Sequence, residues 1–172
     1  PVPGGGWVVA VNSEIAGTGG VGAIKFDATG TIVDAYRILA NTSRNCAGGL
    51  TPWGTWLSCE EVAAGHVWEC NPQLASQGVE RPLLGTFNHE AACVDPENGY
   101  VYLTEDAGDG RFYRFLPSAY GDLTAGQLQA AKVDGTNVTW VNVASTAPAP
   151  RDANTTAFNR GEGIWMGPGV LY

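Results

Sequence analysis

Residues Asn45 to Glu61 read NCAGGLTPWGTWLSCEE, and the rest of the chain is best understood from this stretch. A cysteine and a Gly-Gly turn come first, followed by a Thr-Pro-Trp-Gly corner. The alternating run 55–59 then predicts a short β-strand that ends on two adjacent carboxylates, Glu60 and Glu61. Successive strand side chains point to opposite faces, so only one of the two glutamates can point into a site. A carboxylate at the mouth of a strand, beside glycines that let backbone come close, suits a hard metal ion or a phosphate-handling site.

The composition favours one all-β domain over residues 1–172. The chain contains 24 glycines and 6 tryptophans among many short apolar runs, which is typical of β-structure with many turns. The formal net charge of −8 argues against nucleic acid or an anionic membrane as a partner and permits a cation site, although acidic surfaces also simply keep proteins soluble. No apolar run reaches the ~18 residues of a membrane span. The chain begins PVPG with no signal peptide, so a processed or cut N-terminus is expected.

The four cysteines suggest more than one role. None of Cys46, Cys59, Cys70 and Cys93 forms a C-x-x-C pair, which argues against a structural zinc site. Cys59 and Cys70 flank an expected hairpin and would form a disulfide if they faced each other in an oxidising compartment. Cys46, beside two glycines, could supply a thiolate to a transition metal. Cys93 lies in an apolar run and fits an inert buried thiol.

Turn signals divide the chain into short segments. Strand patterns cover residues 6–14, 21–27, 31–39, 67–70, 91–95, 100–104, 111–116, 138–143 and 170–172. The sequences 27–30 and 96–99, each ending in glycine, predict hairpin turns between neighbouring runs. Residues Leu123–Lys132, with Thr124 as a candidate N-cap, form the one segment with a helical pattern. Residues 144–156 are the most linker-like stretch.

Acidic residues stand at the tips of several expected strands: Glu14, Glu60 and Glu61, Glu90, Glu105 and Asp106, and Glu162. Their spacing, roughly 15 to 60 residues, is not a strict repeat but suits the blades of a β-propeller, whose inner strands line a central channel. At about 40 to 50 residues per blade, the chain has room for about three to four blades. The sequence therefore predicts a small propeller or one part of a longer one.

Carboxylates that converge on one axis repel one another unless a cation lies between them. Ca²⁺ accepts about six to eight oxygen ligands and tolerates ligands from loops. Any one of these glutamates could equally be a solvated turn residue, but the five tips together favour a metal site. His89, next to Glu90, is a candidate base or ligand, with a purely structural histidine as the alternative.

Several segments resemble the PhoX family of bacterial alkaline phosphatases. The matching blocks are NSE (12–14), GAIKFDATGTIVDAYRIL (22–39), the opening stretch (45–61), HEAACVDPENGYVYLTED (89–106) and RGEGIW (160–165). The resemblance implies a six-bladed propeller that is exported by the twin-arginine route and is secreted or periplasmic. It also implies hydrolysis of phosphate monoesters at a buried cluster of iron and calcium, Fe³⁺ and Ca²⁺. Family members are much longer than this chain, so further blades from the same or another chain are expected.

Carried over to this sequence, the resemblance makes Cys46 the candidate cluster thiolate. The candidate carboxylate ligands are Glu14, Glu61, Glu90 and Glu162, with Glu60, Glu105 and Asp106 as further candidates. The candidate catalytic residues are His89 and Arg160, and Arg37 and Arg44 are further candidates for binding phosphate.

The leading hypothesis is a secreted metal-dependent phosphomonoesterase that acts on a small phosphate ester. One alternative is a non-catalytic propeller that retains Ca²⁺ for stability and serves as a binding or structural module. Another is a Ca²⁺-dependent, lactonase-like propeller hydrolase. Metal content separates them, because iron together with calcium supports the phosphatase and calcium alone supports the alternatives.

Overall fold

The computed structural model of the chain describes residues 2, 4–145 and 153–172. The linker-like stretch expected at 144–156 therefore lies mostly outside the described residues. The strands in chain order are β1 (Trp7–Ser13), β2 (Gly19–Phe26), β3 (Ile32–Thr42), β4 (Asn45–Leu50), β5 (Trp56–Glu60), β6 (Val67–Cys70), β7 (Val79–Glu80), β8 (His89–Val94), β9 (Val101–Glu105), β10 (Phe112–Pro117), β11 (Gly126–Asp134), β12 (Asn137–Asn142), β13 (Met166–Gly167) and β14 (Val170–Leu171).

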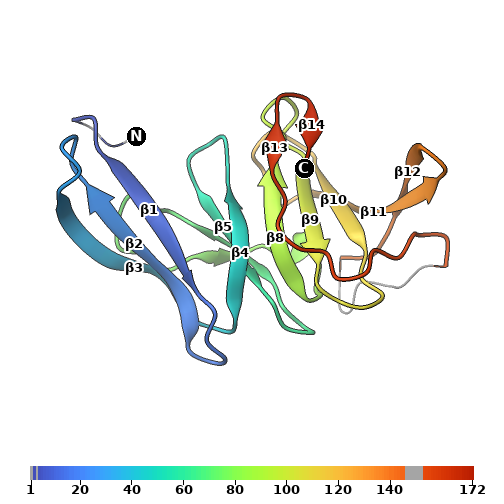
Figure 1. Ribbon diagram of the computed structural model, residues 1–172, viewed down its shortest axis with the longest axis horizontal. Coiled ribbons are helices and arrows are strands. Elements are labelled where there is room, and N and C mark those ends of the chain that lie inside the picture. Colours follow the sequence, from blue (N-terminus) through green and yellow to red (C-terminus); the bar gives the residue numbers. More distant parts are fainter. Residues whose placement is uncertain (1, 3, 146–152) are drawn as a thin grey trace.

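The strands form antiparallel sheets in which neighbours along the chain are neighbours in space. The sheet orders are β1-β2-β3, β4-β5-β6-β7, β12-β11-β10-β9-β8 and β13-β14. The first three sheets stand side by side in sequence order from left to right in Figure 1, and β4 lies between β1 and β8, contacting both. Successive meander sheets that meet along their first strands are the blades of a propeller. The predicted all-β, propeller-type fold is confirmed, with three larger sheets and a two-stranded fourth.

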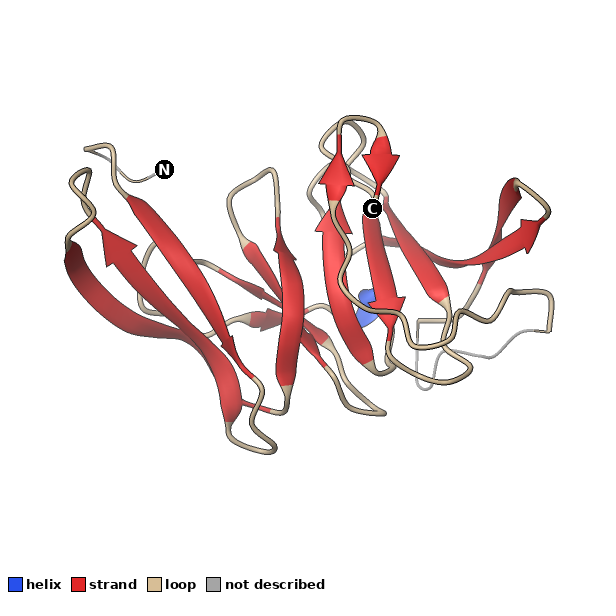
Figure 2. Cartoon of the chain, viewed as in Figure 1, coloured by secondary structure: helices blue, strands red, loops and turns tan. Residues whose placement is uncertain are grey.

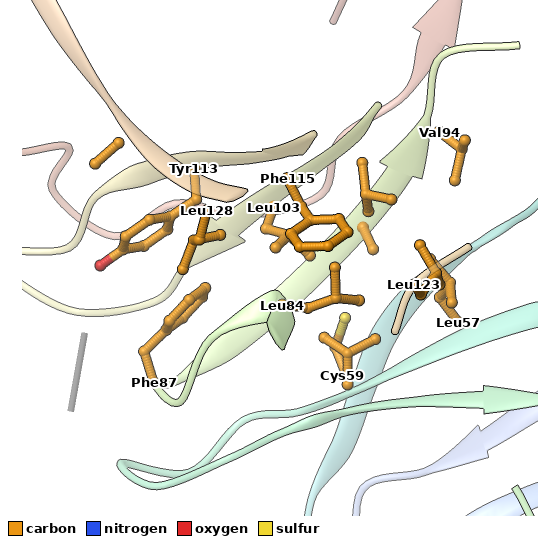
Figure 3. Close-up of a cluster of buried hydrophobic side chains, with 14 of the residues drawn as sticks. Leu57, Cys59, Leu84, Phe87, Val94, Leu103, Tyr113, Phe115, Leu123 and Leu128 are labelled. Carbon is orange, nitrogen blue, oxygen red and sulfur yellow. The ribbon is translucent and has the colours of Figure 1, made fainter. Parts of the chain in front are cut away.

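Two hydrophobic clusters join the sheets. The larger cluster contains Leu57 and Cys59 of β5 and residues of β8 to β11, and Figure 3 shows Leu84 and Phe87 packed beside Leu103, Tyr113, Phe115 and Leu128. The smaller cluster joins the first two sheets and contains Val21, Ala23, Ile38, Leu39 and Cys70. Burial of these side chains is the main force that fixes how the sheets lie against each other.

Local turn chemistry places the hairpins where the sequence predicts them. Gly30 and Gly99 have positive φ angles of 86° and 76°, which glycine adopts without steric cost. Asp27 caps the first turn, because its Oδ1 accepts from the backbone N–H of Thr29 at 2.8 Å and of Thr31 at 3.0 Å. The hydroxyl of Thr29, which donates to the same oxygen at 2.7 Å, lowers the pKa of Asp27 most, and the backbone bonds add to this effect.

The predicted Gly-Gly turn is wrong, because Gly48 and Gly49 lie inside strand β4. A Cβ at Gly48 would lie 1.9 Å from the carbonyl oxygen of Leu57 on β5, and a Cβ at Gly49 would lie 2.0 Å from that of Ala92 on β8. The two glycines thus serve close approach of backbones rather than chain reversal.

The predicted helix Leu123–Lys132 is also wrong, because this stretch forms a turn followed by strand β11. Strand β11 pairs with β10 on one side and β12 on the other. Leu128 and Ala130 are buried in the larger cluster, so tertiary pairing overrides the local helical pattern. Within the described residues, the one helix is a short 3₁₀ turn, Pro82–Leu84, drawn in blue in Figure 2, and no helix is long and apolar enough to cross a membrane.

The predicted Cys59–Cys70 disulfide is absent, and all four cysteines are free thiols. On the β5–β6 ladder Cys59 pairs with Val67, whereas Cys70 pairs with Trp56. Cys59 and Trp56 are three positions apart on β5, so the two thiols lie on opposite faces of the sheet. Each packs into a different hydrophobic cluster.

Candidate metal centre

Five of the predicted ligands gather where the first strands of the sheets come together. Glu14 follows β1, Cys46 lies in β4, Glu61 follows β5, Glu90 lies in β8 and Asp106 follows β9. The ligand atoms of Glu14, Cys46 and Glu61 lie within 4.8 Å of one another, and so do those of Glu61, Glu90 and Asp106. Glu61 belongs to both groups and therefore links them. These five residues are called the acidic cluster below.

A hydrogen bond joins the thiol of the acidic cluster to one of its carboxylates. The Cys46 thiol donates to Glu90 Oε1 at 3.3 Å. Burial, followed by this bond and the nearby charge of Glu90, raises the pKa of Cys46 well above its ordinary value. Burial also raises the pKa of Glu61 and of Glu90. Neighbouring carboxylates raise both pKa values further, whereas the hydrogen bond to Cys46 lowers them.

The donor set fits metal ions. Four carboxylates offer hard oxygen ligands of the kind that Ca²⁺ binds. One thiol, once deprotonated, offers a softer ligand that suits a transition metal such as iron. A cation would also relieve the mutual repulsion that raises the pKa values of Glu61 and Glu90.

Glu60 points away from the acidic cluster, as the alternation along β5 predicts for one of the two adjacent glutamates. Its Oε1 accepts from the backbone N–H of Ser43 at 2.8 Å. Its Oε2 accepts from Trp68 Nε1 at 3.0 Å and from the backbone N–H of His66 at 3.2 Å. Glu60 thus fastens β5 to the β3–β4 turn and to β6.

The same division holds for the second acidic pair. Glu105 is buried, and its Oε2 accepts from the backbone N–H of Arg111 at 2.8 Å and from the hydroxyl of Tyr113 at 3.0 Å. Asp106 enters the acidic cluster, and its Oδ1 lies 2.6 Å from Arg160 Nε. The Arg160 side chain is 63% exposed, so much of its planar guanidinium faces solvent next to the cluster.

Glu162 is exposed at the edge of the acidic cluster, outside the two close groups. Its charge contributes to the raised pKa of Glu90, which places the two carboxylates near each other. Its backbone carbonyl accepts from Thr104 Oγ1 at 2.7 Å, which ties the segment before β13 to β9. Arg37 lies on β3 and Arg44 in the β3–β4 turn, both exposed, and the carbonyl of Arg44 accepts from the backbone N–H of Glu61 at 2.9 Å.

His89 lies in the hydrophobic core rather than in the acidic cluster. Its neighbour Glu90 takes the opposite face of β8, as alternation requires. The ring of His89 packs at a tilt against Phe87 with centroids 3.6 Å apart, and its Nε2 lies 3.1 Å from the carbonyl oxygen of Gly85. Complete burial lowers the pKa of His89 from 6.5 to about 3.

Replacing His89 with glutamine is expected to reduce the loss of stability in acid. The unfolded chain takes up a proton at its imidazole near pH 6.5, whereas the folded chain resists it down to about pH 3, so stability falls as pH drops below 6.5. At about 1.4 kcal/mol per pH unit, the wild type loses about 2 kcal/mol from this group between pH 6.5 and 5. Urea unfolding of the metal-free protein at pH 7 and pH 5 measures the effect. An equal acid loss in wild type and His89→Gln would contradict it.

Asn12 opens the NSE block (12–14) of the family resemblance, but it was not among the candidate site residues. It lies two residues before Glu14, and side chains two apart on a strand share a face. Its side chain makes hydrogen bonds with Ala47 of β4, next to Cys46, and with Trp56 of β5. Beyond that block, the sign in the sequence that Asn12 belongs to the site is that this polar residue shares a strand face with the predicted ligand Glu14.

The model of a protein family described as 'Alkaline phosphatase PhoX' matches residues 12–66 and 62–171 of this chain. The chain belongs to the PhoX family. The matched residues include all five members of the acidic cluster, so the family's profile spans the whole candidate site. A search of curated proteins found no match.

A solved structure agrees with the family assignment. PhoX of Pseudomonas fluorescens, in complex with vanadate, a transition state analogue, is similar to this PhoX-family chain with a TM-score of 0.61 and 20% sequence identity. The similarity covers 72% of this chain and 40% of that chain, so this chain spans less than half of the protein it matches. At this level of identity, the likeness supports the fold.

Proposed function

We propose that this chain carries metal ligands of a PhoX-type, metal-dependent phosphomonoesterase. The observation that supports this is the acidic cluster, in which four carboxylates and a thiol from three sheets approach within 4.8 Å in two linked groups. We assign Glu14, Cys46, Glu61, Glu90 and Asp106 as ligands, with Fe³⁺ and Ca²⁺ as the ions. The thiolate suits iron and the carboxylate oxygens suit both ions.

Such ions would neutralise phosphoryl oxygens and lower the pKa of a bound water molecule. Glu61 lies in both close groups and would be a ligand in each. Cys46 would have to lose the proton that it donates to Glu90 in order to act as a ligand, so binding would release a proton and strengthen as pH rises. The buried carboxylate of Glu90 would then be available as a ligand.

Arg160 is the residue that we propose to contact the phosphate. The carboxylate of Asp106 lies 2.6 Å from its Nε as an ion pair and keeps the guanidinium beside the acidic cluster, while the side chain is otherwise largely exposed. A planar guanidinium binds two phosphate oxygens at once, which orients the ester for attack. Asp106 would thus serve both the cations and the position of Arg160.

The remaining predicted residues divide by their hydrogen bonds. Glu162 stays a candidate ligand, because its carboxylate lies near Glu90 at the open edge of the acidic cluster. We assign Glu60, Glu105 and His89 to the scaffold. The two carboxylates accept hydrogen bonds from neighbouring strands, and the imidazole lies in the core.

A small phosphate ester is the proposed substrate, since the net charge of −8 disfavours nucleic acid. Export from the cytoplasm, to the periplasm or the medium, is proposed from family membership. Further blades, from the same or another chain, are proposed to complete the propeller, because the match covers 40% of the solved PhoX chain.

The test is elemental analysis of the purified protein together with hydrolysis of para-nitrophenyl phosphate. Iron and calcium with turnover that is lost on chelation are expected. Calcium alone without turnover would favour a non-catalytic propeller module, and calcium-dependent opening of a lactone would favour a lactonase. If the protein shows no bound metal and no turnover after both ions are added, the proposal is contradicted.

A further inference from the structure

The backbone at Cys46 departs from the regular strand ladder. On the β4–β5 ladder Asn45 pairs with Glu60 and Gly48 pairs with Ser58, so the register shifts between these pairs. Two residues, Cys46 and Ala47, therefore stand opposite one residue of β5, as in a β-bulge. The thiol of Cys46 leaves the strand at this bulge and reaches Glu90 on the neighbouring sheet. The direction of the thiol therefore depends on the shape of the bulge.

One side chain from another sheet holds the bulge. Asn12 of β1 donates from Nδ2 to the carbonyl oxygens of both bulged residues, at 3.3 Å for Cys46 and 2.8 Å for Ala47. Its Oδ1 accepts from Trp56 Nε1 at 3.0 Å and from Ser58 Oγ at 3.1 Å. The orientation of the amide is unambiguous, because carbonyl oxygens only accept and an indole N–H only donates. Every polar group of the Asn12 side chain therefore serves this junction.

The polar contacts continue behind Asn12 into the buried interior. Ser58 and Asn45 are both fully buried, and Asn45 donates from Nδ2 to Ser58 Oγ at 3.0 Å. Asn45 Oδ1 in turn accepts from Thr42 Oγ1 at 2.6 Å. Asn12 is thus supported by a satisfied network, and such networks rigidify the groups that they hold.

We propose that Asn12 is a positioning residue that fixes the Cys46 bulge so that the thiol points at Glu90 and Glu61. This inference rests on the proposed metal site. Asn12 does not touch a metal or a substrate in this assignment and acts through the backbone of Cys46. A residue with this role changes the metal–thiolate bond, whereas a merely structural residue changes only stability.

Cobalt titration of the chelator-treated protein distinguishes the two roles. A Co²⁺ ion bound to a thiolate absorbs in the near ultraviolet through sulfur-to-metal charge transfer, and Cys46→Ser sets the background. Asn12→Ala is expected to weaken this band and to lower Co²⁺ affinity by about 10- to 100-fold, the usual effect of losing a partner that orients a ligand. Ser58→Ala is the matched control, because it disturbs the same network but leaves both bonds from Asn12 to the bulge. It should lower the thermal midpoint and keep the band.

The outcomes separate this inference from the proposed function. A wild-type protein without a thiolate band would overturn the metal site and the role of Asn12 together. A normal band in Asn12→Ala, with only a lower thermal midpoint, would overturn the role of Asn12 alone. If Asn12→Ala does not fold, Asn12→Asp keeps the acceptor for Trp56 and Ser58 but loses both donors. Faster hydrogen exchange over residues 45–50 of the metal-free variant is then expected, and unchanged exchange would overturn the inference.

Discussion

Glu61→Gln is expected to lower metal affinity by about 100-fold or more, beyond the effect usual for a residue that only orients a ligand. Glu61 is the one residue shared by the two close groups of the acidic cluster, so its loss removes a ligand from both. The amide keeps the shape of the side chain but offers no negative charge. Under the proposed function, hydrolysis that depends on the cluster should fall with the metal.

The same substitution is expected to stabilise the metal-free protein at neutral pH. Burial and the nearby Asp106 and Glu14 raise the pKa of Glu61, so its ionised form is disfavoured in the fold. For a carboxyl group with a raised pKa, stability falls as pH rises through the folded pKa. Glutamine removes this penalty above that pH, and the gain vanishes below pH 4.5, where the carboxyl is protonated in both states.

Calorimetric titration with Ca²⁺ and thermal unfolding in chelator measure these two effects. The matched control is Glu97→Gln, which removes the same charge from an exposed position in the turn between β8 and β9. Glu97→Gln should change neither metal affinity nor the stability of the metal-free protein. A Glu61→Gln protein that binds metal like wild type would remove Glu61 from the ligand set.

The hairpins and the separation of Glu60 from Glu61 were predictable because their signals are local. Asp27 and Gly30 determine a turn through a side-chain bond and a positive φ that involve adjacent residues only. The alternation of β5 separates Glu60 from Glu61, since the period of a strand is two. The resemblance to the PhoX family supplied the rest, because nothing in the spacing of Glu14, Cys46 and Glu90 shows that they meet.

The predictions that were wrong concern segments whose structure depends on partners far away in the sequence. Leu123–Lys132 has a helical pattern, but most of it forms β11, which pairs with β10 on one side and β12 on the other. Leu128 is buried in the larger hydrophobic cluster. For His89, the structural alternative fits its place in the core, since adjacent residues on β8 face opposite ways. Gly48 and Gly49 look like a turn because the sequence does not show which backbones approach them.

Gly49→Ala is expected to destabilise the protein by at least about 3 kcal/mol, at the upper end of overpacking effects and a large share of a typical stability of about 5–15 kcal/mol. The new Cβ would lie 2.0 Å from the carbonyl oxygen of Ala92, a backbone atom that cannot move aside as a flexible side chain can. Strands β4 and β8 would have to separate, which disturbs the packing of two sheets at once.

Gly22→Ala is the matched control for this substitution, because Gly22 also lies inside a strand, β2. A Cβ there would have the carbonyl oxygen of Tyr36 as its nearest neighbour, at 4.0 Å, which is an ordinary contact. Urea unfolding should therefore give Gly22→Ala a midpoint close to wild type and Gly49→Ala a far lower one. The separation of β4 from β8 should also lengthen the distance from Cys46 to Glu90, so Gly49→Ala should lose metal affinity even where it remains folded. Equal midpoints for the two variants would show that the sheets do not meet at Gly49, and the close approach that brings thiol and carboxylate together would then need another cause.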